Sequence, residues 1–228
     1  MYIFGMTTAL VSQNQPDQQH QPGLRERKRT ACAAQIHEAA IRLVAEHGYE
    51  AVTIAQIAET AAVSPKTVFN YWGSKDGAIL GVGETGPDSA WSQAYLAPEN
   101  TDHFGPIIDL LATRSAGQRQ EHARLMLRVF QEQPRLVGLR LAHAAETAEA
   151  FAALCAAKLG QLRPDHDAQK LAQEARLIVS IALAVARHAW QEWARDEDGR
   201  PLETHLATSL ELHQKLCNDM ISANGGKQ

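Results

Sequence analysis

Apolar residues recur at intervals of three or four along most of the chain from Leu24 onward, which is the period of an α-helix with one buried face. Val, Ile and Thr occur, but nowhere in the alternation with polar residues that a half-buried strand shows. The pattern therefore predicts an all-α fold of about nine helices. They cover about 25–47, 54–61, 65–72, a short stretch after Ser74, 103–115, 118–133, 134–159, 166–195 and 202–220.

Local signals mark the ends of the short helices. Gly48 supplies the left-handed residue that often ends a helix. Thr53, with Gln56 three residues later, forms a capping box at the start of the second helix. Ser64 followed by Pro65 is a favourable start for the third. Two short helices joined by so few residues have the arrangement of a helix-turn-helix.

Composition divides the chain further. Residues 12–23 are rich in Gln and contain no apolar side chain suited to a core, so the N-terminal part is predicted to be disordered. Glycines at 77, 81, 83 and 86 disfavour a continuous connecting helix, and the pattern leaves open whether they break it. The predicted parts are a disordered tail at 1–23, a helix-turn-helix domain at 24–74, a connecting helix and linker at 75–98, a second helical domain at 99–221, and a disordered tail at 222–228.

A helix-turn-helix places its second helix in the major groove of DNA, with its N-terminal residues at the base edges. Lys66 can donate to guanine, and Asn70 has the donor and acceptor that an adenine edge needs. Thr53 suits a phosphate through its hydroxyl and the helix dipole, and Tyr71 and Lys75 are placed to bind the DNA backbone. The predicted DNA-binding residues are Arg27, Arg29, Thr53, Ser64, Pro65, Lys66, Thr67, Asn70, Tyr71 and Lys75.

Charge limits the class of partner. The net charge is −4 and the isoelectric point about 6.2, which argues against an architectural protein that binds all DNA alike, since such proteins are usually basic. Positive charge is concentrated at residues 25–29, directly before the helix-turn-helix, where it can lie along the DNA backbone or in a minor groove.

Three scattered cysteines fit neither a disulfide framework nor a zinc site, and no apolar run is long enough to span a membrane. We therefore expect a cytoplasmic protein without metal or cofactor.

Two short motifs admit a second interpretation. Residues 81–86 match the GxGxxG pattern of dinucleotide-binding loops, but they follow a helix and not a strand, which favours a linker. Asp165, His166 and Asp167 have side chains that can bind a metal. They follow Pro164 at the start of a predicted helix, however, where acidic residues act as caps.

The segment from about Arg25 to Leu80 resembles the DNA-binding domain of the TetR family of bacterial repressors. The resemblance is carried by Gly48-Tyr49, Thr53-Ile54, Ile57-Ala58, Val63-Ser64, the run Thr67-Val68-Phe69-Asn70-Tyr71-Trp72, and Ser74-Lys75. Phe69 stands where many members have Tyr, so a phosphate contact from that hydroxyl is absent. Trp72 and Gly73 replace a more usual Phe and Pro.

The resemblance implies an all-helical homodimer in which a small, usually apolar ligand releases the protein from a palindromic operator. It also implies that residues 24–74 are the DNA-binding domain and that residues 99–221 are the ligand-binding and dimerisation domain. The order of Pro134, Leu159-Gly160 and Trp190-x-x-Trp193 is similar to a C-terminal domain of some actinobacterial members, including mycofactocin-system regulators, and implies hydrophobic or acyl-CoA-like effectors. The two last predicted helices, 166–195 and 202–220, are the expected dimerisation helices. The candidate ligand-binding residues are Met126, Phe130, Phe151 and Trp190. Three polar residues lie on otherwise apolar helices: Arg128, His143 and Arg187. Each can contact the anionic head of a ligand, solvent or a partner subunit.

Two alternatives accompany this prediction. An activator of the same family binds operators as a repressor does, and the sequence does not separate the two. A helical enzyme with an N-terminal DNA-targeting domain is the other alternative. The sequence contains no spacing typical of a nucleophile and its base and no paired carboxylates, although catalytic triads are assembled in space and need no fixed spacing.

Overall fold

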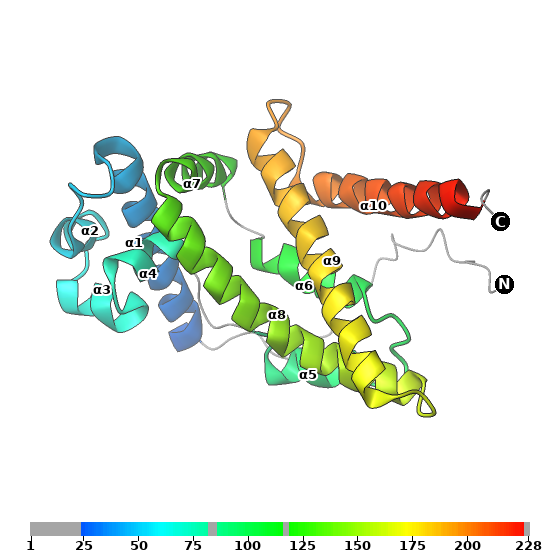
Figure 1. Cartoon of the computed structure of the whole chain (residues 1–228). Helices are drawn as coiled ribbons and strands as arrows, with labels where there is room; N and C mark the ends of the chain where they lie inside the picture. Colours follow the sequence, from blue (N-terminus) through cyan, green and yellow to red (C-terminus); the bar gives the residue numbers. More distant parts are fainter. Residues whose placement is uncertain (1–23, 82–85, 116–118, 226–228) are drawn as a thin grey trace.

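The computed structural model describes residues 24–81, 86–115 and 119–225. Regular structure within these ranges is entirely helical, which confirms the predicted all-α fold. The helices of the described ranges are α1 (Leu24–His47), α2 (Ile54–Thr60), α3 (Pro65–Trp72), α4 (Lys75–Leu80), α5 (Ser89–Leu96), α6 (Gly105–Ser115), α7 (Gln120–Glu132), α8 (Pro134–Leu162), α9 (Ala168–Arg195) and α10 (Leu202–Gly225) (Figure 1). None of these helices combines the length and apolar character needed to cross a membrane.

Helix α5 lies in a stretch that the hydrophobic pattern assigns to a linker. Asp88 caps it by accepting a hydrogen bond from the backbone N–H of Trp91 (2.8 Å). Trp91 stacks on Tyr95 one turn later, with ring centroids 4.8 Å apart. At the other end, the buried ammonium of Lys158 from α8 donates to the carbonyl of Ala97 (2.7 Å). Contacts with α8 therefore hold this segment as a helix, and they are invisible to a local pattern.

Helix α4 stops at Gly81, which answers the question that the glycines left open. Gly81 has a φ of 60°, and a Cβ there would lie 2.4 Å from the ring of His37 on α1. Both the left-handed backbone and the close approach therefore require glycine. The predicted tails lie mostly outside the described residues, but α10 continues to Gly225, beyond the predicted end at about 220.

The long helices α8 and α9 form the centre of the C-terminal part. Figure 1 shows α8 leading away from α1–α4 and α9 returning against it, with α10 then projecting toward the C-terminus. The core of this part combines buried side chains of α5, α6, α8 and α9.

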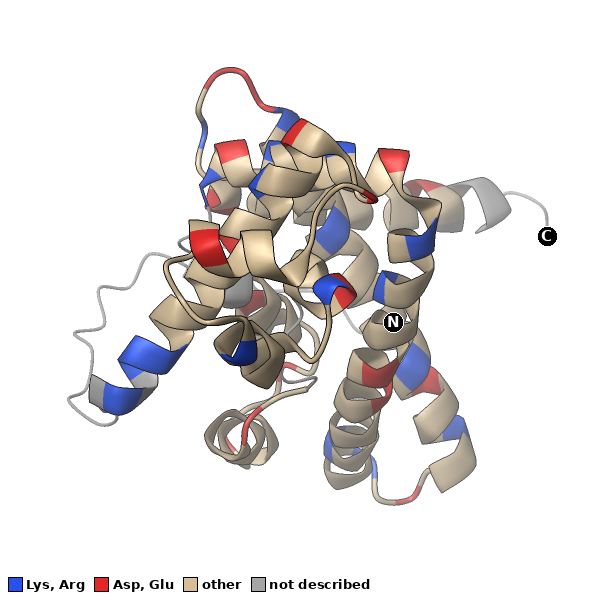
Figure 2. Cartoon of the chain, turned by 90° about the vertical axis from the view of Figure 1, so that its left-hand side faces the viewer, with Lys and Arg blue, Asp and Glu red and all other residues tan. Residues whose placement is uncertain are grey.

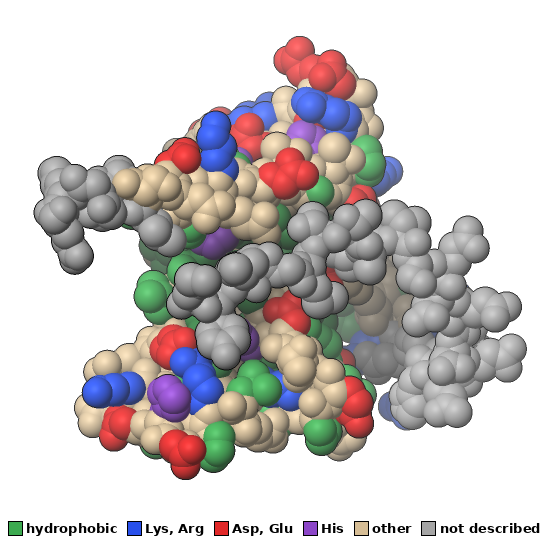
Figure 3. All heavy atoms as spheres, turned by 90° about the vertical axis from the view of Figure 1, so that its right-hand side faces the viewer, with side chains coloured by type: hydrophobic (Ala, Val, Ile, Leu, Met, Phe, Trp, Pro, Cys, Tyr) green, Lys and Arg blue, Asp and Glu red, His purple; other side chains and the backbone are tan. Residues whose placement is uncertain are grey.

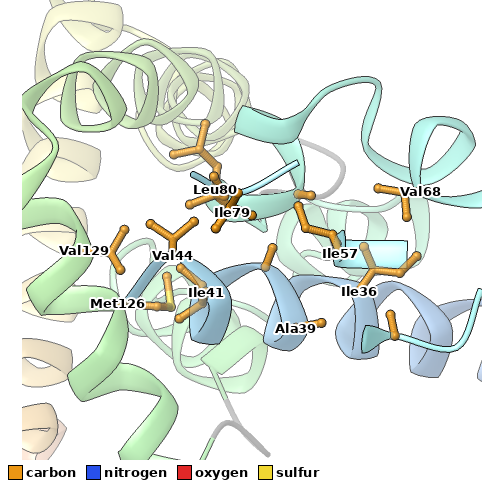
Figure 4. Close-up of a cluster of buried hydrophobic side chains, with 14 of the residues drawn as sticks. Ile36, Ala39, Ile41, Val44, Ile57, Val68, Ile79, Leu80, Met126 and Val129 are labelled. Atoms are coloured by element: carbon orange, nitrogen blue, oxygen red, sulfur yellow. The ribbon is translucent and has the colours of Figure 1, made fainter. Parts of the chain in front are cut away.

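A second core joins the four N-terminal helices to α7. Figure 4 shows Met126 and Val129 of α7 lying against Ile41 and Val44 of α1, with all four side chains buried. Leu136 at the start of α8 belongs to the same cluster. The packing therefore crosses the boundary at about residue 98 that composition suggested.

Candidate nucleic-acid interface and ligand cavity

The turn between α2 and α3 is held by bonds made within a few residues. Thr53 and Gln56 form the predicted capping box, in which the Gln56 amide oxygen accepts from Thr53 N (2.8 Å). The Ser64 hydroxyl accepts from the backbone N–H of Thr67 (3.1 Å) and caps α3. Val68 is buried with the α2 side chains, so α3 presents a fixed face to solvent.

That outer face of α3 collects most of the predicted base-reading residues. Pro65, Lys66 and Asn70 are exposed, as is Ser64 just before them. Thr67 is half-buried, and its hydroxyl lies 2.8 Å from the Ser64 hydroxyl. Polar groups from the first two turns of the helix therefore lie together where a groove floor would meet them.

Phe69 is a member of this face that the sequence prediction left out. Its side chain is 60% exposed, which is unusual for so large an apolar group. The sequence registered only the absence of a tyrosine hydroxyl at this position. Helical periodicity could have predicted this exposure. Phe69 lies between Lys66 and Asn70 and directly follows the buried Val68, and neighbouring residues of one helix cannot all face inward.

Lys75 is placed differently from the other predicted contacts. Its ammonium donates to the carbonyls of Tyr49 (2.7 Å) and Val52 (2.9 Å) and lies 3.8 Å from the centroid of the Tyr49 ring. The hydroxyl of Tyr49 in turn donates to Asp76 (2.5 Å). Lys75 thus fastens the loop between α1 and α2, with one of its three N–H groups left for other partners.

The remaining predicted contacts surround α3. Thr53 is exposed at the start of α2, and Tyr71 is half-buried near the end of α3. Arg27 and Arg29 are exposed on the first turns of α1, so the basic run lies inside this helix (Figure 2).

A cavity of about 270 Å³ lies among α6 to α10. It is lined by Leu111, Ala112, Met126, Arg140, Ala144, Leu183, Ala186, Arg187, Trp190, Leu202 and Leu206. Two of the four predicted ligand-binding residues, Met126 and Trp190, therefore line the same cavity. Phe130 lies beside the cavity, with its ring 4.8 Å from the Arg140 guanidinium. Phe151 lies elsewhere, because it is fully buried against Trp91 of α5.

Two arginines supply the charge of the cavity wall. Arg140 is half-buried and also lies 5.4 Å from the Trp190 ring. Burial lowers the pKa of Arg140, and the positive charge of Arg187 lowers it further. Among the other two polar candidates, Arg128 is exposed and donates to the Ala45 carbonyl (2.7 Å), and His143 is half-buried near Glu146.

Helix α7 contacts both the cavity and the N-terminal helices. The imidazole nitrogens of His122 on α7 and His37 on α1 lie 3.1 Å apart, and His37 Nδ1 bonds the Ala78 carbonyl (2.9 Å). Since a carbonyl only accepts, the Nδ1 of His37 carries the proton and its Nε2 accepts from His122. Burial lowers the pKa of His37 to about 4 and also lowers that of His122. A neutral histidine pair thus joins α1 to α7.

Catalytic and metal-binding arrangements find little support in the described part of the chain. Asp167 caps α9 by accepting from Lys170 N (2.9 Å), and no group of three potential metal ligands occurs among the described residues. Residues 82–85 of the GxGxxG match lie outside them. The Ser209 hydroxyl lies 2.9 Å from His188, but the nearby Asp196 faces His205 and Arg200, so these groups form no triad.

Comparison with known proteins identifies the family. Residues 36–80 match the family model described as bacterial regulatory proteins, tetR family. The transcriptional regulator TcmR of Streptomyces glaucescens is 30% identical over 205 residues, which cover 83% of this chain and 86% of TcmR. The mycofactocin biosynthesis regulator MftR of Mycobacterium tuberculosis is 28% identical over 177 residues, covering 75% of this chain and 84% of MftR.

The solved structure of the fatty acid degradation regulator FadR from Bacillus halodurans has a TM-score of 0.38 and 16% identity, covering 85% of this chain and 96% of that one. A similarity this loose supports no transfer of ligand or operator. TcmR and MftR are named as regulators and not as enzymes, which argues against the helical-enzyme alternative. The matched helix-turn-helix and the coverage of TcmR together show that the chain belongs to the TetR family of transcriptional regulators.

Proposed function

We propose that the chain is a ligand-responsive repressor that binds a palindromic operator as a homodimer and leaves it when a small hydrophobic effector binds. The observation that carries the proposal is the outer face of α3. There Lys66, Phe69 and Asn70 are exposed on a helix that Val68 anchors from the other side. A rigid helix with exposed donors at its N-terminal end is what major-groove recognition requires.

Each of the three side chains has a chemistry suited to a base edge. The Lys66 ammonium donates to guanine O6 or N7, and the Asn70 amide pairs with adenine N6 and N7. The Phe69 ring suits the methyl group of thymine. Thr53, Tyr71 and the basic end of α1 would then contact phosphates and set the orientation.

The outer half of α10 supports dimerisation. Leu212, Leu216 and Met220 follow one another at intervals of four and are 44, 53 and 65% exposed. Such a stripe costs free energy in water and is typical of a subunit interface. Hydrophobic side chains are also visible between the upper and lower parts of the face toward which α10 projects (Figure 3). A twofold dimer would present two α3 helices to half-sites about 34–36 Å apart, one DNA turn.

The dimer is tested by its mass in solution. Leu216→Glu should shift the chain from dimer to monomer, because it places a charge in the apolar stripe. Gln214→Glu adds the same charge on the same exposed helix and should leave the dimer intact. Both masses are measured by light scattering after gel filtration, and a dimeric Leu216→Glu variant would contradict this interface.

The cavity and α7 support control by a ligand. Met126 both lines the cavity and packs against Val44 of α1, so an occupied cavity would favour a different packing of α7 on the DNA-binding helices. A ligand shifts this equilibrium only by the difference of its affinities for the two arrangements. A repressor of this kind would act in the cytoplasm, where it would be associated with the nucleoid when bound to DNA.

DNA binding is tested by selecting duplexes from a random library at about 150 mM salt, with protein refolded free of ligand. We expect a palindrome. Asn70→Ala should relax base preference at one position of each half-site and cost about 1–3 kcal/mol of binding free energy. Gln131→Ala, an exposed amide on α7, is the control. Recovery of no common sequence, or an unchanged sequence with Asn70→Ala and Lys66→Ala, would contradict the proposal.

A further inference from the structure

The cavity among α6 to α10 has a charge that its apolar walls do not explain. Its lining contains nine uncharged residues and two arginines, Arg140 of α8 and Arg187 of α9, and no carboxylate. An enclosure built only to accept an apolar molecule would have no need of two cations. Two positive charges beside one apolar cavity repel one another and favour an anion between them.

The surroundings of Arg140 hold its guanidinium in place without neutralising it. The group lies over the rings of Phe130 (4.8 Å) and Trp190 (5.4 Å). Aromatic faces stabilise a guanidinium but leave its N–H groups at the edge available for hydrogen bonds. No ion pair involves Arg140 or Arg187 among the residues that the structure describes, whereas Arg163, Arg195 and Arg200 each have a carboxylate partner.

The two arginines differ in exposure, so one part of the cavity wall is open to solvent and charged and another is more buried. Arg187 is exposed, while Arg140 is half-buried and lies over two aromatic rings. Leu183 of α9 and Leu202 and Leu206 of α10 supply apolar parts of the same wall. A molecule with one charged end and one apolar end can meet both kinds of surface at once.

We propose that this cavity binds a small amphipathic anion, whose carboxylate or phosphate head is held between Arg140 and Arg187 and whose apolar body lies against Met126, Trp190 and the leucines. The inference rests on the proposed ligand-responsive function and specifies the chemical class of its effector. A cavity of about 150 Å³ holds one benzene molecule. The 270 Å³ available here therefore accommodate an apolar body of about ten non-hydrogen atoms.

The head group has two possible sources, a free carboxylic acid or the phosphates of an acyl thioester. Four probes separate them when their binding to the full chain, refolded free of ligand, is measured by calorimetry. Octanoate carries the carboxylate, octanamide has the same body without charge, octylamine has the opposite charge, and octanoyl-CoA carries phosphates outside a similar body. We expect octanoate or octanoyl-CoA to bind with one molecule per chain, and octanamide to bind about tenfold to a hundredfold more weakly.

Two variants link this preference to the arginines. Arg140→Gln and Arg187→Gln should each weaken binding of the anion at least tenfold and leave octanamide binding unchanged. Arg176→Gln removes the same charge from an exposed position of α9 outside the cavity and should bind as the unaltered chain does. Far-UV circular dichroism checks that each variant is folded.

The outcomes separate this inference from the proposed function. Equal affinity for octanoate, octanoyl-CoA and octanamide, tighter binding of octylamine, or no binding of either anion would overturn the anionic-ligand assignment, even if an operator is found. Arginine-dependent binding of an anion by a chain that selects no operator would instead support the cavity and contradict the repressor.

Discussion

The histidine pair between α1 and α7 predicts that the folded chain loses stability as the pH falls below neutrality. His37 is lowered in pKa from 6.5 to about 4 by burial, so the unfolded chain takes up a proton between these values that the folded chain does not. A group whose pKa is lower in the folded state destabilises the fold as protons become available. The effect begins as the pH drops through 6.5 and is complete near 4. His122 acts in the same direction.

The two pKa values of His37 set the size of the effect. Between pH 7 and pH 5 the folded state loses about 2 kcal/mol relative to the unfolded state, and the full loss by pH 4 is about 3 kcal/mol. Losses of this size are a substantial part of the stability of an ordinary domain. They are readily measured by urea denaturation followed through tryptophan fluorescence.

The assay compares His37→Asn with the unaltered chain at both pH values. An asparagine amide can donate to the Ala78 carbonyl as His37 does, but it does not titrate. We expect the variant to lose about 2 kcal/mol less stability between pH 7 and pH 5 than the unaltered chain. His47→Gln, an exposed histidine of the same helix, should keep the original pH dependence. An identical pH dependence for His37→Asn would refute the reasoning.

Three further outcomes can be measured by denaturation. Asp167→Ala removes the cap of α9 and should cost about 1 kcal/mol of unfolding free energy, while Asp165→Ala, an exposed neighbour, should cost little; equal losses would exclude the capping role. Phe151→Ala should cost about 3–5 kcal/mol without changing the affinity for a cavity ligand, and weaker ligand binding at matched stability would place Phe151 in the cavity after all. Lys75→Met should lower stability by about 1.5–3 kcal/mol, because two loop carbonyls lose a charged donor, and an unchanged melting temperature would mean that these bonds do not hold the loop.

The sequence was most informative where structure depends on neighbouring residues. The caps by Thr53, Ser64 and Asp167 are made with backbone groups three residues away, so the pattern alone located them. The family resemblance was also visible in the sequence because the residues that build the helix-turn-helix are contiguous. Helix α5 is absent from the sequence prediction although Asp88 is a local cap, because its other end is held by Lys158 of the distant helix α8.

Features that depend on the meeting of distant elements could not be derived in this way. Lys75 stays a predicted contact of the DNA backbone, but nothing in its own neighbourhood of the sequence indicates that its ammonium also donates to two carbonyls of the loop between α1 and α2. The cavity is built from five helices, so the sequence could suggest Met126 and Trp190 as apolar candidates and Arg187 as a possible contact for an anion. It gave no reason to pair Arg187 with Arg140, since which faces of α8 and α9 meet is decided by their packing.

The position of Met126 has a consequence for engineering. Its side chain is part of the cavity wall and, at the same time, of the core that contains Ile41 and Val44, so no packing boundary separates the cavity from the helix-turn-helix. A chimaera cut after Leu80 would leave the underside of α1 against a foreign helix with unmatched side chains. Grafts meant to change the DNA sequence that this protein binds should therefore carry α7 together with α1–α4 as one block.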